Sequence, residues 1–185
     1  MIQSSRKIIR ANCLLIFLWL GFTIPITKAN GFSGARVTID GLTCSMCSKS
    51  VEKAIRKLDF VANVKMDLNA NLALISFVDG EEVSFHQIAK KIRSSGFSVR
   101  EMVVEAAVGQ VSVREGATAQ VQQSVFCLVD VLEKRAKGNI EFKIIGEHFM
   151  PRKDWKKWSD QCSAELETAM VNQFPEAKEY YFATL

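Results

Sequence analysis

Between residues 34 and 105 the apolar residues change period several times along the chain, and this limits the folds that the segment can adopt. Some stretches repeat an apolar side chain every second position, as half-buried strands do, and others repeat it at helical spacing. The predicted elements are strands at 35–40, 61–68, 72–78 and 97–104 and helices at 48–58 and 85–92. Asn69-Ala70-Asn71 suits a tight turn between the middle strands, and Gly96 suits the end of the second helix. The order βαββαβ predicts an α+β fold.

A pair of cysteines, Cys44-Ser45-Met46-Cys47, lies where the first strand gives way to the first helix. Cysteines three apart at such a junction can direct both sulfurs at one point, and the positive end of the helix dipole favours the thiolate form. Two soft ligands without a neighbouring histidine suit copper(I) best. Mercury(II) is a close chemical relative, and zinc prefers more ligands. The spacing therefore predicts a soft-metal site at Cys44 and Cys47.

The same spacing also occurs in disulfide-exchange proteins and in halves of zinc sites, so two alternatives stay open. A disulfide could simply hold the loop, or the pair could belong to an exported thiol-disulfide oxidoreductase or redox sensor. A thioredoxin-type pair usually has a proline inside the motif and another shortly downstream, whereas beyond residue 29 the chain has only Pro151 and Pro175. Met46 is either a third soft donor or a solvent-facing residue.

Three short motifs make residues 34–105 resemble the heavy-metal-associated domain family: Gly41-Leu42-Thr43-Cys44-Ser45-Met46-Cys47, Ser50-Val51-Glu52-Lys53-Ala54 and Ser95-Gly96-Phe97. This family includes small copper chaperones, the amino-terminal domains of copper-transporting ATPases and the periplasmic mercury-binding protein. The resemblance implies a ferredoxin-like fold, metal ligation by Cys44 and Cys47, and a loop turn at Gly41. Leu42 replaces the usual methionine that tethers the loop into the core. Phe97 stands where many eukaryotic chaperones have lysine, which favours a bacterial or ATPase-like relative.

The first 29 residues have the pattern of a cleaved export signal. Basic residues precede the apolar run 13–26, and Thr27-Lys28-Ala29 suits signal peptidase. We therefore expect an exported protein, periplasmic or secreted; an uncleaved signal that anchors the chain in a membrane is the alternative. In an oxidising compartment, metal binding and disulfide formation would compete for the two cysteines.

Net charge argues against a nucleic-acid partner. The formal charge of +4 comes entirely from the first 29 residues, which carry four basic residues and no acidic residue. A local basic face remains on the first predicted helix, at Lys49, Lys53, Arg56 and Lys57. It is either a solvated helix face or a docking surface for an acidic metal donor or acceptor protein. Contact with a membrane is expected only through a copper transporter or an uncleaved signal.

Residues 106–118 are small and polar and are expected to form a linker to a small α+β domain at 119–185. Strands at 121–133 and 140–150 should form a hairpin across Lys137-Gly138-Asn139, followed by a helix at 153–174 and a strand at 179–185. No family resemblance is found for this part. Whether Cys127 and Cys162 pair with each other cannot be decided from the sequence.

The predicted hairpin would bring Cys127 opposite His148, with Met150 nearby, as a second copper site. A register slip of one residue would send these side chains to opposite faces, and core packing of Cys127 and Met150 is the alternative. Cys162 is expected to be buried and His86 to lie on the surface. The chain shows no catalytic triad, paired carboxylates in a cleft or phosphate-binding loop, so we predict a metal-binding protein without enzymatic activity. A protein-binding module with a structural metal domain is a further alternative.

Overall fold

The computed structural model describes residues 31–113, 117–130, 134–162 and 164–185. The predicted export signal, 1–29, lies outside the described residues. Within the described part, no helix is both long and apolar enough to cross a membrane.

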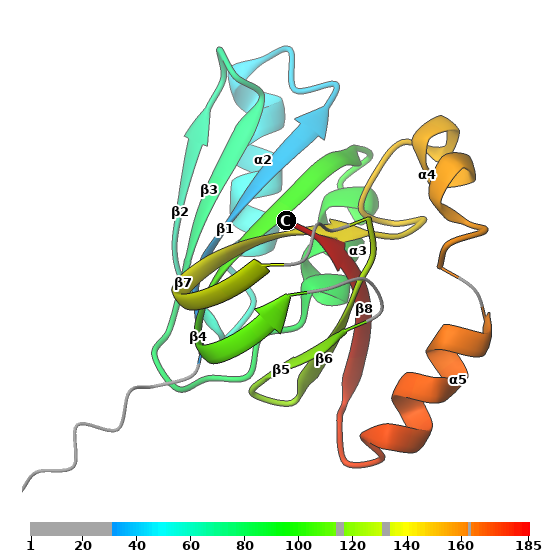
Figure 1. The fold of residues 1–185 in the computed structure, drawn as a ribbon. Coiled ribbons are helices and arrows are strands. Elements are labelled where there is room, and N and C mark those ends of the chain that lie inside the picture. The colour runs from blue at the N-terminus through cyan, green and yellow to red at the C-terminus, as the bar shows by residue number, and fades with distance from the viewer. Residues whose placement is uncertain (1–30, 114–116, 131–133, 163) are drawn as a thin grey trace, which may run out of the picture.

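One mixed sheet, in the strand order β2-β3-β1-β4-β7-β8-β6-β5, runs through the described part of the chain (Figure 1). In chain order the elements are β1 (Gly31–Asp40), α2 (Ser45–Ile55), β2 (Val61–Asp67), β3 (Leu72–Phe77), α3 (Phe85–Ser94), β4 (Ser98–Val113), β5 (Thr118–Val121), β6 (Ser124–Leu128), β7 (Lys134–Ile145), α4 (Arg152–Trp158), α5 (Ala164–Gln173) and β8 (Glu179–Thr184). All neighbouring strands are antiparallel except β6 and β8.

The amino-terminal half has the predicted βαββαβ order, with β1 between β3 and β4. The helices α2 and α3 pack their apolar sides against this part of the sheet, and Val51 of α2, Ile88 of α3 and Val37 of β1 are all fully buried in one core. The ferredoxin-like α+β architecture is therefore confirmed for this half. Helix α2 begins three residues earlier than the sequence pattern indicated, which places Cys47 inside its first turn.

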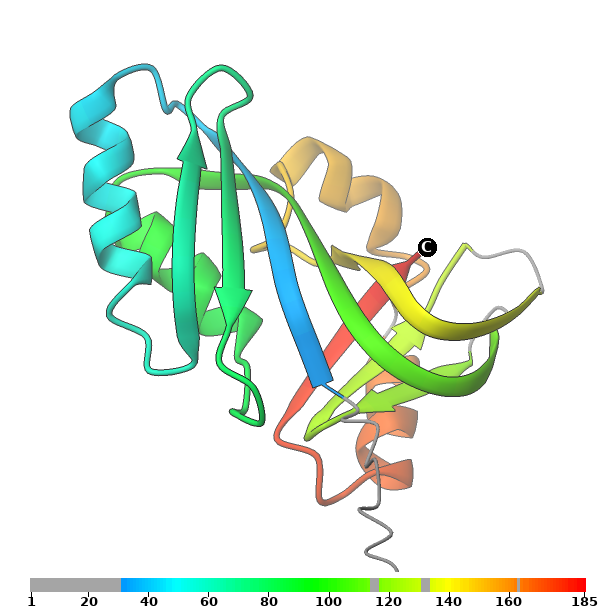
Figure 2. The same cartoon turned by 90° about the vertical axis from the view of Figure 1, so that its left-hand side faces the viewer.

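The linker expected at 106–118 is wrong for most of its length, because β4 continues without interruption to Val113. Its second part pairs with β7, from Ala106 opposite Ile140 to Val113 opposite Lys134. Ala106 is fully buried, so the small side chain at this position fits the sheet interior and does not mark a connector. Figure 2 shows β4 and β7 curving together from one half of the molecule into the other.

The hairpin expected across Lys137-Gly138-Asn139 is also wrong, since β7 runs straight through these residues. Gly138 has a φ of +94° and lies opposite Val108, where the β4–β7 register shifts. From this pair the register passes to Val111 opposite Ala136, so the extra residue of the bulge lies on β4 and Gly138 lies in the strand opposite it. The strand β6 pairs with β5 and β8, not with β7.

The single helix expected at 153–174 is broken into α4 and α5. The break falls after Trp158, where Ser159, Asp160 and Gln161 follow; serine and aspartate compete with the helix backbone for hydrogen bonds. The final strand is confirmed as β8.

Aromatic side chains join the two halves in a common core. Phe126 of β6 lies 5.8 Å from Phe32 of β1 and 6.3 Å from Phe85 of α3, measured between ring centroids. It also stacks on Phe142 of β7 at 5.3 Å and on Tyr181 of β8 at 5.3 Å. All five rings are buried. The carboxy-terminal half therefore shares its apolar core with the amino-terminal half.

Strand β8 also caps the amino-terminal end of α3. The backbone N–H of Phe85 donates a hydrogen bond to the Tyr181 hydroxyl at 3.1 Å. Ser84, the N-cap residue, accepts from the Gln87 N–H and donates its hydroxyl proton to Glu179. These contacts satisfy backbone donors that a helix leaves unpaired at its start. The start of α3 is thus built from both halves of the chain.

Replacing Gly34 tests how closely β1 and β3 approach. A Cβ atom at this position would lie 2.7 Å from the Ile75 carbonyl oxygen, a backbone atom that cannot move aside cheaply. We expect Gly34→Ala to lower the free energy of unfolding by about 1–3 kcal/mol. Urea denaturation measures this, with Gly31→Ala as the control, because a Cβ there meets only the Gln122 amide nitrogen at 3.5 Å. Equal losses in both variants would contradict the close approach.

Glu179 should make stability depend on pH. Burial raises the pKa of this carboxyl above its ordinary value, against the opposing effect of the Ser84 hydrogen bond. The folded state therefore holds the proton more tightly than the unfolded state does. The protonated carboxyl of Glu179 stabilises the fold below the ordinary pKa of 4.5, and this stabilisation is lost as pH rises through the raised pKa. Glutamine does not titrate, so the free energy of unfolding of Glu179→Gln should rise relative to that of the parent protein as pH increases from 4.5 to 7. Urea denaturation at the two pH values measures this difference. The exposed Glu176→Gln should show no such difference between the two pH values.

Candidate metal centre

The loop between β1 and α2 holds the cysteine pair at the protein surface. Gly41 has a φ of +86°, a conformation that favours glycine, and the Thr43 N–H bonds to its carbonyl oxygen at 2.8 Å. Leu42 is only 2 % exposed, so its side chain anchors the loop in the core as the family methionine would. The turn predicted at Gly41 and the tethering role predicted for Leu42 are both confirmed.

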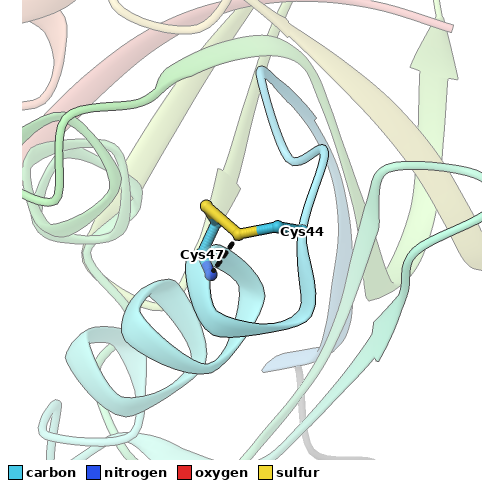
Figure 3. The surroundings of a disulfide bond; sticks show 2 residues. All are labelled: Cys44 and Cys47. Atoms are coloured by element: carbon cyan, nitrogen blue, oxygen red, sulfur yellow. Dashed lines mark hydrogen bonds between the residues drawn. A yellow bond between two sulfur atoms is a disulfide. The ribbon is translucent and has the colours of Figure 1, made fainter.

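Cys44 is the N-cap residue of α2, and its sulfur accepts a hydrogen bond from the Cys47 N–H at 3.1 Å (Figure 3). The two Cα atoms lie 5.3 Å apart, and the sulfurs are joined in a disulfide. Cys44 is exposed and Cys47 is half-buried. The site is therefore described in its oxidised form, with both sulfurs at one point beside the start of a helix.

The electrostatics of the loop suit a pair of thiolates. No acidic residue lies in the first turn of α2, so the positive end of the helix dipole is not neutralised there. Lys49 and Lys53 are exposed on the same helix, and neither has a carboxylate partner within the described residues. Arg56 differs, because it pairs with Glu52 at 2.8 Å and reaches the Val64 carbonyl oxygen at 2.5 Å. Arg56 therefore stabilises the fold, while the lysines remain available to a partner.

Met46, the residue between the cysteines, is 72 % exposed. Its side chain lies outside the core, and among the described residues no hydrogen bond or core contact is recorded that would fix its thioether beside the sulfurs. Its role as a third donor stays a prediction.

The second copper site predicted from Cys127, His148 and Met150 is wrong. Cys127 lies on β6 opposite Phe182 of β8 and is buried beside Val125 and Met170. Met150 packs in a separate cluster with Val129 and Ile145, and His148 is exposed in the turn after β7. The prediction failed because the strand pairing that it assumed does not form. Within the described residues, no group of three or more His, Cys, Asp or Glu side chains is placed to hold a metal ion.

Cys162 follows α4 and is half-buried against the cluster that contains Met150. Burial raises the pKa of its thiol to about 12, with a smaller contribution from nearby Cys127. A thiol with this pKa stays protonated at neutral pH and is a poor metal ligand. Core packing is thus the role that the structure supports for Cys162, although it is less buried than expected.

His86 is exposed at the start of α3, so its predicted surface position is confirmed. Its ring also contacts Phe149 and Tyr181. Sequence periodicity could not show these contacts, because both partners lie more than sixty residues further along the chain.

Comparison with known proteins agrees with this geometry. Residues 36–98 match the model of the heavy-metal-associated domain. The copper chaperone CopZ of Bacillus subtilis is 36 % identical over 61 residues, which make up 33 % of this chain and 87 % of the chaperone. The chain belongs to the heavy-metal-associated family through this domain.

Larger relatives share the same domain. Copper-transporting ATPase 1 of Rhizobium meliloti is 28 % identical over 113 residues, 61 % of this chain but only 13 % of the ATPase. Among solved structures, a CopZ metallochaperone matches 36 % of this chain and 98 % of its own, with 24 % identity and a TM-score of 0.34.

Proposed function

We propose that this protein is an exported heavy-metal carrier whose Cys44 and Cys47 thiolates bind copper(I) and pass it to a partner. The observation that carries the proposal is the placement of the two sulfurs at one point on an exposed loop, beside the unneutralised start of α2. The family membership and the copper chaperone among its relatives support it. Mercury(II) and zinc are the alternative ions, and zinc is less suited to two ligands.

Reduction must precede metal binding. The Cys44–Cys47 disulfide takes up two electrons and two protons from a dithiol reductant, and the two thiols then release protons as their sulfurs bind the ion. Since the sulfurs already lie together, reduction requires little rearrangement of the loop. We expect copper(I) binding by the reduced protein and none at this site by the oxidised protein.

Transfer proceeds by ligand exchange. An incoming thiolate of the partner binds the copper(I) ion, one donor sulfur leaves, and a second exchange completes the transfer without release of a free ion. The exposure of Cys44 leaves room for the incoming sulfur. Lys49 lies near the loop and Lys53 in the last turn of α2, so the two lysines form a positive helix face that begins near the loop. We propose that the partner presents carboxylates to this face.

The oxidised pair also favours a second function, thiol-disulfide exchange by an exported oxidoreductase or redox sensor. A disulfide at the exposed start of a helix is accessible to an attacking thiolate. The reduction potential of the pair separates the two functions. A potential within the range of known disulfide oxidoreductases, together with turnover of a disulfide substrate, would favour exchange.

Transfer itself is tested by mixing the copper(I)-loaded, reduced protein with the copper-free amino-terminal domain of a copper-transporting ATPase. We expect copper to equilibrate between the proteins in the presence of a copper(I) chelator too weak to compete with either. Lys49→Gln combined with Lys53→Gln should slow transfer, most strongly at low salt. The matched control is Lys90→Gln combined with Lys91→Gln on α3. Copper that appears in the chelator before it reaches the acceptor would contradict direct exchange.

A further inference from the structure

A cavity of about 140 Å³ lies where the start of α3 meets the β5–β6 turn and the start of β8. Hydrogen bonds hold these distant segments together. The Lys178 N–H donates to the Gln123 carbonyl oxygen at 2.8 Å, and the Ser84 hydroxyl donates to Glu179. No residue of the cysteine loop is among the described residues that line the cavity. The cavity is therefore a separate feature at the junction of the two halves.

Two side-chain oxygens at this cavity are buried without a hydrogen-bond donor. Gln122 Oε1 and Glu179 Oε2 have no partner among the described residues, and both residues line the cavity. The other end of each side chain is held: Gln122 Nε2 donates to the Glu81 carbonyl oxygen at 2.8 Å, and Glu179 Oε1 accepts from Ser84. A buried acceptor without a donor is costly, so these oxygens require a donor from outside the chain.

The backbone donors at the start of α3 are already used, which argues against an anion in the cavity. The Phe85 N–H donates to the Tyr181 hydroxyl at 3.1 Å, and the Gln87 N–H donates to Ser84 Oγ at 3.3 Å. Within the described residues, the unpaired buried side-chain atoms at this cavity are oxygens only. The cavity therefore selects a ligand that donates hydrogen bonds.

The charges around the cavity favour a donor that is also a cation. Lys178 Nζ pairs with Glu82 at 2.6 Å, so these two charges balance each other. Among the ion pairs of the described residues, none includes Glu179. Burial disfavours the charged form of the Glu179 carboxyl and raises its pKa, and a cation bound beside it would offset that penalty.

We propose that this cavity binds the ammonium group of a small primary amine, with Gln122 Oε1 and Glu179 Oε2 as the acceptors. A primary ammonium has three N–H donors, enough for both oxygens and a water. The volume is below the roughly 300–1,000 Å³ of cavities for drug-sized ligands, so the cavity admits the ammonium head and a short alkyl chain. The proposal involves neither cysteine and does not depend on the proposed function.

Butylammonium and tetramethylammonium ions separate hydrogen bonding from simple charge attraction. Both ions carry one positive charge, but only butylammonium has N–H donors. Each chloride salt is titrated into the intact, oxidised protein and followed by nuclear magnetic resonance. We expect butylammonium to give saturable shifts of the Gln122 side-chain amide and the Ser84 backbone amide, and tetramethylammonium to give none. Equal binding of the two ions, or no saturable shift with butylammonium, would overturn the proposal and leave a cavity filled by water only.

Two variants locate the acceptors. Glu179→Gln keeps the shape of the side chain but removes the charged acceptor. Gln122→Asn tolerates the φ of +53° at this position while it withdraws the amide oxygen from the cavity. We expect each variant to weaken butylammonium binding at least about tenfold, the effect of losing one hydrogen bond to a charged group.

Glu176→Gln is the matched control, because it removes an exposed carboxylate that does not line the cavity. We expect it to bind butylammonium as the parent protein does. Unchanged affinity in both Glu179→Gln and Gln122→Asn would overturn the proposal. Copper(I) plays no part in these titrations, so this proposal and the proposed function can each fail without the other.

Discussion

Phe126→Ala is expected to destabilise the whole protein, not only the half in which it lies. The Phe126 side chain is fully buried and contacts rings from both halves, including Phe32 and Phe85 in the metal-binding part. Truncation of a fully buried phenylalanine typically costs about 3–5 kcal/mol. We expect a loss of this size in urea denaturation, with a single transition observed by both fluorescence and circular dichroism.

Amide hydrogen exchange distinguishes a shared core from two independent units. If the halves unfold together, Phe126→Ala should lower the protection of β1 and α2 as well as that of β6 and β8. The control is Val171→Ala on α5, whose side chain is 43 % exposed and whose loss should stay within about 0.5 kcal/mol. Unchanged protection of β1 and α2 in the phenylalanine variant would show that the metal-binding half is stable alone.

Cys44→Ser combined with Cys47→Ser is expected to abolish copper(I) binding while the fold remains intact. Serine is a good N-cap residue, so position 44 can still accept the hydrogen bond from the residue 47 N–H. The hydroxyl, however, stays protonated and is a hard ligand that copper(I) does not favour. Anaerobic titration of the reduced proteins against a copper(I) chelator should give about one ion for the parent chain and none for the variant.

Cys162→Ser is the matched control for this pair, because it also removes a thiol, from a half-buried position away from the loop. We expect unchanged copper(I) stoichiometry. If copper(I) binding survives in the double variant but falls in the Cys162→Ser chain, Cys162 binds the ion. That result would contradict binding by Cys44 and Cys47.

Local patterns were sufficient to predict the metal-binding half. The period of Val51, Ile55 and their neighbours and the short turn between β2 and β3 depend on contacts close in sequence. The cysteine spacing likewise placed both sulfurs on one loop. The start of α2 was missed, because the capping contact of the Cys44 sulfur is not a usual sequence signal, and β1 begins at Gly31, earlier than the predicted strand at 35–40.

The carboxy-terminal half could not be predicted in the same way, because long-range pairing determines it. Gly138, with its positive φ, is compatible with a turn and with a strand position opposite a bulge, and only the partner strand β4 decides between them. The error propagated, since the predicted site at Cys127, His148 and Met150 depended on that turn. The surface position predicted for His86 is confirmed, but its ring contacts with Phe149 and Tyr181 are long-range, and a local pattern does not reveal them.

X-ray absorption spectroscopy at the copper edge tests the central claim most directly. The sample is the reduced protein loaded anaerobically with one equivalent of copper(I). Our account predicts a first shell made of sulfur only, which disappears when Cys44 and Cys47 are changed to serine. A first shell dominated by nitrogen or oxygen in the parent protein would contradict copper(I) binding by the two thiolates.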